Sequence, residues 1–239
     1  MKKSIVLAAA AILGFAFSAK AQTNLQTFYD AGRGYATTTF EMFQSDKWGN
    51  TFFFIDHYYG TKDEHDALAA RGATNGSYYE IERAINFWQD TKLGGLSLHL
   101  EYDGATWGNA VYCIGANYFL HNQNFNNTLN LYLMYENMTG WGNAKTPVKF
   151  SAVWGMQDLF GVKGLRFNGF MDIWGNDSVF GLGDETHVSL LTEPQLWYNI
   201  GQHMGIDNLH LGGEVECSVN FAGHKGFMCN PCIGAKWVF

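Results

Sequence analysis

Polar and apolar residues alternate along this chain with the two-residue period of an extended strand. In LHLGGEVECSVNF (209–221), leucine, valine, cysteine and phenylalanine share one phase, and histidine, glutamate, serine and asparagine share the other. LSLHLEY (96–102) and LRFNGFMDIW (165–174) repeat this scheme. The pattern predicts half-buried β-strands and little helix.

Such segments recur along the chain, separated by clusters of Gly, Asn, Asp and Lys that predict turns. We expect strands near 25–31, 35–43, 50–60, 75–87, 95–103, 110–121, 128–137, 147–157, 165–174, 186–200, 209–221 and 231–239. This number, about twelve, is even, as a closed antiparallel barrel requires when both chain ends lie on one side. The sequence therefore predicts an all-β fold, a transmembrane antiparallel barrel occupying residues 22–239 as one domain.

A soluble β-sandwich also alternates, with its apolar face turned toward a core. Two features favour a membrane barrel instead. Short gaps such as QNFNN alternate with long ones such as GTKDEHDALAARGATNG, as tight turns alternate with long outer loops. Aromatic residues also gather near the predicted strand ends, as interfacial girdles do. They are Trp48, Tyr58, Tyr59, Trp88, Trp107 and Trp141.

The last strand ends on Phe239, with aromatic Trp237 two residues before it. This ending resembles the C-terminal signal by which outer-membrane barrels are recognised for insertion. We therefore expect Phe239 to engage the barrel assembly machinery. The same phase places Ile233 and Ala235 against lipid, and Lys236 in the barrel interior.

The first residues, MKKSIVLAAAAILGFAFSAKA, have the three regions of a secretory signal peptide. The sequence predicts that residues 1–21 are removed by cleavage after Ala21, and that the mature protein resides in the cell outer membrane. No later apolar run approaches the roughly 20 residues of a membrane helix, so any span must be a strand.

Charge and cysteine content narrow the functions. The chain has 15 basic and 22 acidic residues, and removal of Lys2, Lys3 and Lys20 with the signal peptide moves its net charge from -7 to -10. Nucleic acid is therefore excluded as a partner.

Cys229 and Cys232 have C-x-x-C spacing but no second pair, which favours small apolar fillers or a local disulfide. The eight histidines lack a ligand spacing such as H-E-x-x-H, so the sequence predicts no metal and no cofactor.

Four stretches, LQTFYDAGRGY, FEMFQSDKWGNTFFFID, LLTEPQLWYN and EVECSVNFAGHKGFMCNP, resemble a family of small, functionally uncharacterised outer-membrane barrel proteins. Patches such as DIWGND are distantly similar to the nucleoside-specific channel-forming (Tsx-like) porins. No nucleoside-contacting residues can be matched one by one. The resemblance implies a twelve-stranded outer-membrane barrel, without a substrate.

The polar phase of the strands predicts an acidic interior interleaved with aromatic rings. The residues expected along a solute path are Asp56, Glu80, Glu101, Arg166, Asp172, Trp174, Glu193, Trp197, Glu214, Glu216 and Lys236. Further interior positions are Asp30, Glu41, Glu82, Glu136 and Lys149, with the aromatic residues Phe28, Tyr78, Trp88, Tyr132 and Phe170. An excess of carboxylates attracts cations, and rings stack on flat solutes. The pattern predicts a porin or channel for small solutes that favours cations and accepts nucleoside-like molecules.

Other interpretations remain open from the sequence. The carboxylates and rings of a small barrel also suit a filled, structural interior. His57, Ser77 and Asn75 share the apolar phase, which is the arrangement that an outer-membrane lipid hydrolase needs. An adhesive barrel would use the long loop that contains the charged residues 63–66. Arg83 also falls on the apolar phase, which predicts a bulge or a position near the membrane edge.

Overall fold

The computed structural model describes residues 21–59, 75–108, 110–139, 143–177 and 185–239. The predicted signal peptide, apart from its last residue, and the charged loop residues 63–66 lie outside these ranges. The strands are β1 (Gln22–Asp30), β2 (Ala36–Asp46), β3 (Gly49–Tyr59), β4 (Asn75–Ile85), β5 (Leu96–Ala105), β6 (Ala110–His121), β7 (Asn127–Thr139), β8 (Val148–Gln157), β9 (Leu165–Gly175), β10 (Val188–Thr192), β11 (Gln195–Tyr198), β12 (Leu209–Phe221) and β13 (His224–Val238). Two short 3-10 helices, η2 (Leu159–Gly161) and η3 (Ile200–His203), lie between strands.

The strands form one closed antiparallel barrel. Each strand pairs with its sequence neighbours, and β1 pairs with β13, which closes the sheet. The segments β10 and β11 share the neighbours β9 and β12 and make up one barrel strand. Thr192 pairs with Met171, and three residues later Gln195 pairs with Asn168, so the register continues unchanged. The barrel therefore has twelve antiparallel strands, as the alternation predicts.

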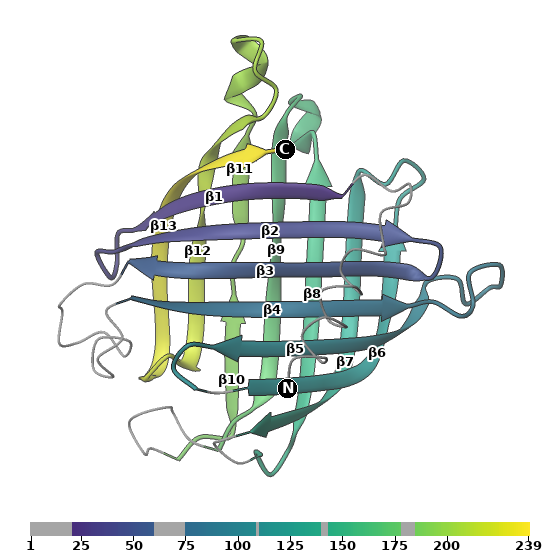
Figure 1. Cartoon of the computed structure of the whole chain (residues 1–239), viewed down its shortest axis with the longest axis vertical. Coiled ribbons are helices and arrows are strands. Elements are labelled where there is room, and N and C mark those ends of the chain that lie inside the picture. Colours follow the sequence, from purple (N-terminus) through teal and green to yellow (C-terminus); the bar gives the residue numbers. More distant parts are fainter. Residues whose placement is uncertain (1–20, 60–74, 109, 140–142, 178–184) are drawn as a thin grey trace, which may run out of the picture.

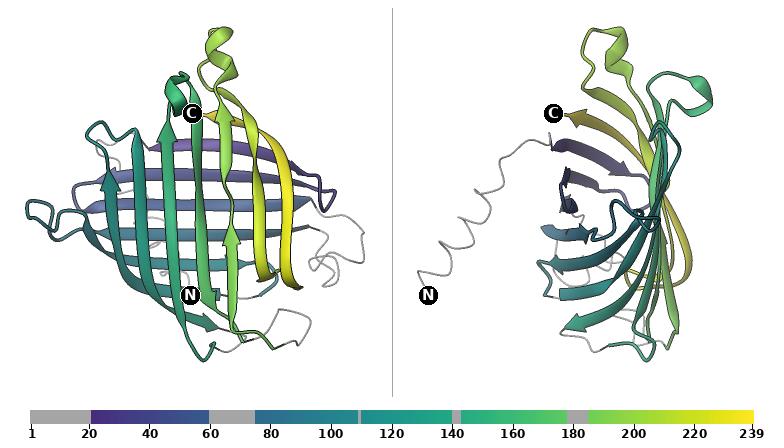
Figure 2. Two further views of the ribbon diagram at one scale, coloured as in Figure 1. Left: turned by 180° about the vertical axis from the view of Figure 1, so that it is seen from behind. Right: turned by 90° about the vertical axis from the view of Figure 1, so that its right-hand side faces the viewer.

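Two walls of the barrel face each other across the interior. In Figure 1, β1–β5 cross in front of β8–β12, and the side view in Figure 2 shows the front strands curving away from the rear wall. The first and last strands meet at one end, where the backbone N–H of Phe239 donates to the carbonyl of Thr23. We call this end the terminal end, and the other end the mouth. Within the described residues, no helix is long and apolar enough to cross a membrane.

Alternation places polar residues inside the barrel and apolar residues outside. On β13, Ile233 is 72% exposed on the outer surface, whereas Lys236 is 8% exposed on the inner one. Phe239 and Trp237 are also exposed. The orientation predicted for the last strand is therefore confirmed. A soluble sandwich would have the opposite polarity, with its charged side chains facing water.

The last strand begins earlier than the sequence predicts, at His224 and not near residue 231. Pro231 interrupts the sequence pattern but not the strand. It lies just beyond Cys232, the last residue of β13 to pair with β1. Its missing N–H therefore breaks no hydrogen bond of the β1–β13 ladder, which is where a proline is tolerated in a sheet.

A bulge near the end of β12 reverses the side-chain phase. The register with β13 shifts between Val219 and Phe221, where Asn220 has a φ of 53°. The ring of Phe221 meets the interior ring of Trp174 edge-on, with centroids 5.7 Å apart. The placement of Phe221 on the apolar outer phase is therefore wrong, because a bulge adds one residue to the two-residue period.

Candidate functional site

The barrel interior collects the polar side chains of the strands. All eleven residues that the sequence places along a solute path lie on the inner side of the barrel wall. Examples are Trp197, which is 1% exposed, and Asp56, whose carboxylate accepts a hydrogen bond from Thr39. The two-residue period fixes this placement, whereas the role of the eleven residues in transport stays a prediction.

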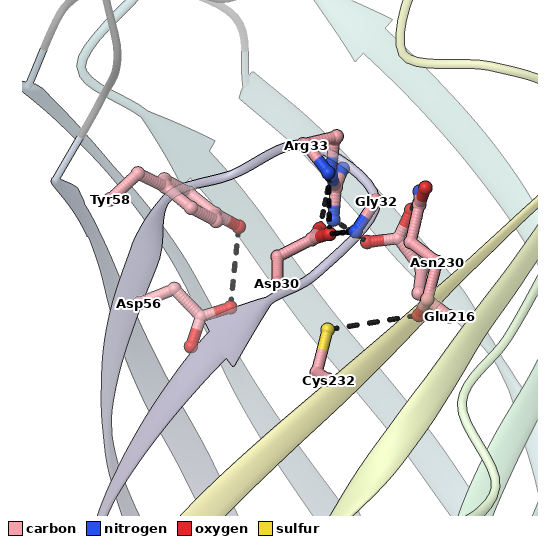
Figure 3. Close-up of polar contacts among 8 residues, drawn as sticks. All are labelled: Asp30, Gly32, Arg33, Asp56, Tyr58, Glu216, Asn230 and Cys232. Atoms are coloured by element: carbon pink, nitrogen blue, oxygen red, sulfur yellow. Dashed lines mark hydrogen bonds and ion pairs between the residues drawn. The ribbon is translucent and has the colours of Figure 1, made fainter.

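A cluster at the mouth joins the first turn to β12 (Figure 3). The guanidinium of Arg33 lies between two carboxylates, with Nε 2.5 Å from Asp30 and Nη2 2.5 Å from Glu216. Asp30 also accepts the backbone N–H groups of Gly32 and Arg33, which folds the turn over the interior. Asn230 donates to the other oxygen of Glu216. We call Asp30, Arg33, Glu216 and Asn230 the mouth cluster.

Arg33 was not among the interior cations predicted from sequence. Burial opposes its charge, but the Glu216 and Asp30 carboxylates raise the pKa of Arg33 further above its ordinary value. It is therefore a permanent positive charge at the mouth. Because Arg33 lies in a turn, no strand phase predicts the direction of its side chain. The neighbouring glycines and Asp30 were the only sequence signal that this turn folds tightly.

A second charged group joins β5, β8 and β9 inside the barrel. Lys149 on β8 contacts Glu101 on β5 at 2.7 Å and Asp172 on β9 at 3.2 Å. The three side chains are buried or nearly so. Lys149 thereby links the two walls, which no pattern within one strand reveals.

Two like-charged pairs adjoin this lysine on the interior face of β4 and β5. Glu80 lies directly opposite Asp103, and Glu82 lies directly opposite Glu101. Like charges directly opposite on neighbouring strands are destabilising. We call these four carboxylates, with Asp172, the inner acidic cluster.

Cationic side chains gather toward the terminal end. Lys236 pairs in register with His210, and Arg166 pairs with Trp197. The ammonium of Lys236 lies 4.4 Å from the centre of the Trp197 ring, and the ring of Phe28 approaches the same indole at 5.5 Å. Two of the interior cations, Lys236 and Arg166, thus lie near one another on the inner face around Trp197.

Some aromatic and basic predictions require correction. Trp88 lies in the turn 86–95 beyond β4, not in the interior. Tyr58 points inward and donates to Asp56, so it is not part of an outer girdle.

Arg83 does lie on the outer phase, close to the turn between β2 and β3, where it pairs with Asp46 at 2.8 Å. Its position near the barrel edge confirms one of the two expectations for it. Trp141 lies outside the described residues.

The cysteines form a local disulfide, but it does not lie within the C-x-x-C pair. Cys217 on β12 and Cys229 on β13 are opposite one another and form a disulfide, with their Cα atoms 4.2 Å apart. Cys113 and Cys232 are free. Cys232 points inward instead, and its thiol donates to the carbonyl of Asn230.

The residues proposed for a lipid hydrolase are brought together in part. His57 and Ser77 are cross-strand partners on the outer face, and His57 Nδ1 lies 3.0 Å from Ser77 Oγ. The backbone N–H of Ser77 donates to Thr106 Oγ1. The side chain of Asn75 lies outside what the structure describes.

Solved structures with this fold are outer-membrane barrels. A NanC porin structure has a TM-score of 0.57 and 8% sequence identity, covering 90% of this chain and 98% of the porin. The outer membrane phospholipase OMPLA of Salmonella typhi, a dimer with bound calcium, has a TM-score of 0.48 and 9% identity over 94% and 93% of the two chains. OccK11 of Pseudomonas aeruginosa has a TM-score of 0.40 and 8% identity over 92% and 96%. The fold is that of a porin-like outer-membrane β-barrel.

Within that class, residues 22–239 match the model of DUF5020, a domain of unknown function, and the chain belongs to this family. No curated protein matches the chain in sequence. The comparisons support a porin-like barrel but not membership of the Tsx-like family.

Proposed function

We propose that this protein is an outer-membrane channel for small solutes that favours cations. The supporting observation is the charge of the interior face in the part of the chain that the structure describes. Twelve carboxylates face inward, whereas only four cations do so. The carboxylates are those of Asp30, Glu41, Asp56, Glu80, Glu82, Glu101, Asp103, Glu136, Asp172, Glu193, Glu214 and Glu216. The cations are Arg33, Lys149, Arg166 and Lys236. A confined acidic interior concentrates cations and repels anions.

The wall formed by β10 to β13 supports this selectivity. Glu214 and Glu216 alternate on β12, and Glu193 lies between β10 and β11 in the preceding barrel strand. Glu216 is neutralised by Arg33, whereas Glu214 accepts only a neutral partner among the described residues, the amide of Gln195 at 2.8 Å. Glu214 therefore contributes the less compensated charge to a passing ion.

A nucleoside-like solute is the narrower form of the proposal, and it has less support. Stacking needs an aromatic face that is free. The indole of Trp197 is already covered by Lys236 and approached by Phe28. We therefore propose small cations as the first solutes to test.

The test is planar-bilayer recording of the refolded mature protein under a KCl gradient. We expect a reversal potential that favours cations. Glu214→Gln keeps the side-chain shape and removes one charge, so it should lower the cation-to-anion permeability ratio about fivefold. Two unit charges about 8 Å apart in water interact by about 0.5 kcal/mol, and losing this charge acts on cations and anions with opposite signs. The difference should shrink at 1 M salt, where the screening length is about 3 Å.

Asp90→Asn is the matched control, because Asp90 is exposed in a turn outside the barrel wall. It should leave the reversal potential unchanged. Repeated insertions without conductance would favour the filled, structural barrel and assign the carboxylates a packing role. A reversal potential that Glu214→Gln does not move would remove this wall from the ion path.

The contact between His57 and Ser77 favours a second function, hydrolysis of membrane lipids. A histidine at hydrogen-bond distance activates a serine as nucleophile. The backbone N–H of Ser77, however, is bound to Thr106 and is not free to stabilise an oxyanion. Phospholipase activity in detergent with Ca²⁺ tests this function: activity abolished by Ser77→Ala would support it, and no activity, or activity that survives the substitution, would exclude it.

A further inference from the structure

The interior face of β4 and β5 concentrates more negative charge than its neighbours compensate. The Glu80–Asp103 and Glu82–Glu101 pairs are consecutive inward-facing positions of the two strands. Among the described residues, Lys149 is the ammonium that contacts this face, and it shares its charge between Glu101 and Asp172. Burying uncompensated carboxylates costs several kcal/mol per charge, so the cluster needs a further cation or protons.

A histidine projects into this cluster and distinguishes it from a purely acidic patch. His99 is 1% exposed, and its Nε2 lies 3.5 Å from Glu82 Oε2 and 3.4 Å from Glu101 Oε2. Both separations exceed the 2.7 to 3.2 Å range of a good N–H···O hydrogen bond. They match the separation of about 3.4 Å between two ligand atoms that share a tetrahedral ion at bond lengths of about 2.1 Å.

A buried carboxylate oxygen without a hydrogen-bond partner among the described residues lies beside the same cluster. Asp103 is 5% exposed, and its Oδ1 has no hydrogen-bond partner among the described residues. A carboxylate oxygen of Asp103 lies within 4.8 Å of ligand atoms of Glu101 and Cys113. Nδ1 of His99 is likewise buried without a partner there, so the polar contacts of this ring are all made through Nε2.

We infer that the barrel interior binds a divalent transition-metal ion through His99 Nε2 and one carboxylate oxygen each of Glu82 and Glu101. The three ligand atoms lie within 4.8 Å of one another. The five carboxylates of the inner acidic cluster with the ammonium of Lys149 carry a net charge of -4, and one divalent ion neutralises half of it. This inference goes beyond the proposed channel and does not depend on conduction.

The donor set selects the class of metal. One imidazole nitrogen with carboxylate oxygens suits Zn²⁺, Mn²⁺, Fe²⁺ or Co²⁺, whereas Ca²⁺ and Mg²⁺ prefer oxygen ligands alone. Neighbouring contacts hold the ligands in place. Lys149 binds the other oxygen of Glu101, and the ring of Tyr132 packs edge-on against His99 at 4.7 Å. Such outer contacts orient metal ligands.

The experiment uses tag-free mature protein, refolded in detergent and dialysed against a chelator. Titration with Co²⁺, followed by its visible absorption and by calorimetry, should show one ion per barrel that Zn²⁺ displaces and Mg²⁺ does not. His99→Gln and Glu82→Gln should each weaken Co²⁺ binding at least about tenfold. Retained heat-dependent gel mobility shows that each variant is folded.

His210→Gln is the matched control. His210 is also a buried interior histidine with an unpartnered Nδ1, but it lies beside Arg166 and Lys236. Its replacement should leave Co²⁺ affinity unchanged. Equal losses in the His210 and His99 variants would overturn the assignment.

Two further measurements do not require the His99 and Glu82 variants to fold. Pulsed electron paramagnetic resonance of Cu²⁺ bound to the wild-type barrel should detect one imidazole nitrogen, and a spectrum without nitrogen coupling overturns the site. Cys113→Ser should leave binding intact. Loss of binding in this variant alone would place the ion on Glu101, Asp103 and Cys113 instead, and no binding at millimolar Co²⁺ would show that protons neutralise the cluster.

Discussion

Single side chains set the charge of this barrel, and Arg33 is the most informative of them. It bridges Asp30 within its own turn and Glu216, 183 residues away in sequence, and so neutralises part of the acidic mouth. The strand period predicts Glu216 as an interior residue but leaves Arg33 unplaced. Charge inventories made from strands alone therefore overstate the negative potential at the mouth.

Arg33→Gln tests this role at the residue scale. Loss of the guanidinium leaves Asp30 and Glu216 without their counterion, so we expect the cation-to-anion permeability ratio to rise about fivefold, by the same Coulomb argument as for Glu214 but with opposite sign. The reversal potential in a KCl gradient measures it.

Arg33→Lys separates charge from geometry. Lysine keeps the charge but lacks the planar fork that contacts two carboxylates at once. We expect it to retain most of the wild-type selectivity. A shift toward anions in Arg33→Gln, or equal shifts in both variants, would contradict a charge-compensating role for Arg33.

At the scale of elements, the alternation predicts every barrel strand, and the differences arise at turns, bulges and prolines. The strand predicted at 186–200 divides into β10 and β11 around Glu193 and Pro194, although its register is continuous. The bulge at Asn220 changes which face Phe221 occupies. Both features depend on backbone geometry that residue polarity does not encode.

The pairing of β12 with β13 also decides which cysteines are bonded. Alkylation of the unfolded, unreduced protein should label two thiols, Cys113 and Cys232, and reduction should expose two more. Peptide mapping should identify the bonded pair as Cys217 and Cys229, 12 residues apart. A bond between Cys229 and Cys232 would contradict the observed pairing.

Loss of this disulfide has a measurable effect on stability. Removing a cross-link that closes a loop of this size should lower the free energy of unfolding by about 2 to 3 kcal/mol, by the chain-entropy model. Urea unfolding of Cys217→Ala should show this loss. Cys232→Ala, which removes a free thiol on the neighbouring strand β13, is the control and should change the midpoint less.

At the scale of the whole molecule, closure of the sheet between β1 and β13 satisfies the backbone hydrogen bonds of both end strands. A closed barrel has no edge strand, which makes it resistant to mild detergent. The outer surface is apolar, as the exposed side chains of Leu133, Phe227 and Ile233 show. These properties agree with the fold of outer-membrane proteins that the solved structures share.

Heat-dependent gel mobility tests the closed barrel directly. The purified mature protein in mild detergent should migrate differently before and after boiling, because the unboiled barrel stays folded. Fractionation of cells should recover it with the outer membrane. Unchanged mobility together with recovery in the soluble periplasmic fraction would contradict the barrel.

The sequence by itself determined the number of strands, the side of the wall that most strand residues face and the acidic character of the interior. Polarity with a two-residue period suffices for this, because a barrel wall separates only an inside from an outside. That period assigns a residue to a face but says nothing of what lies across the interior.

Only the tertiary structure decided which interior residues meet. Lys149 reaches Glu101 three strands away, Arg33 reaches Glu216, and His99 lies between Glu82 and Glu101. These contacts depend on the register between neighbouring strands, the tilt of the strands and the path of the turns, which jointly set the distances across a closed barrel. Residue polarity constrains none of the three, so the charged clusters emerge only when the barrel closes.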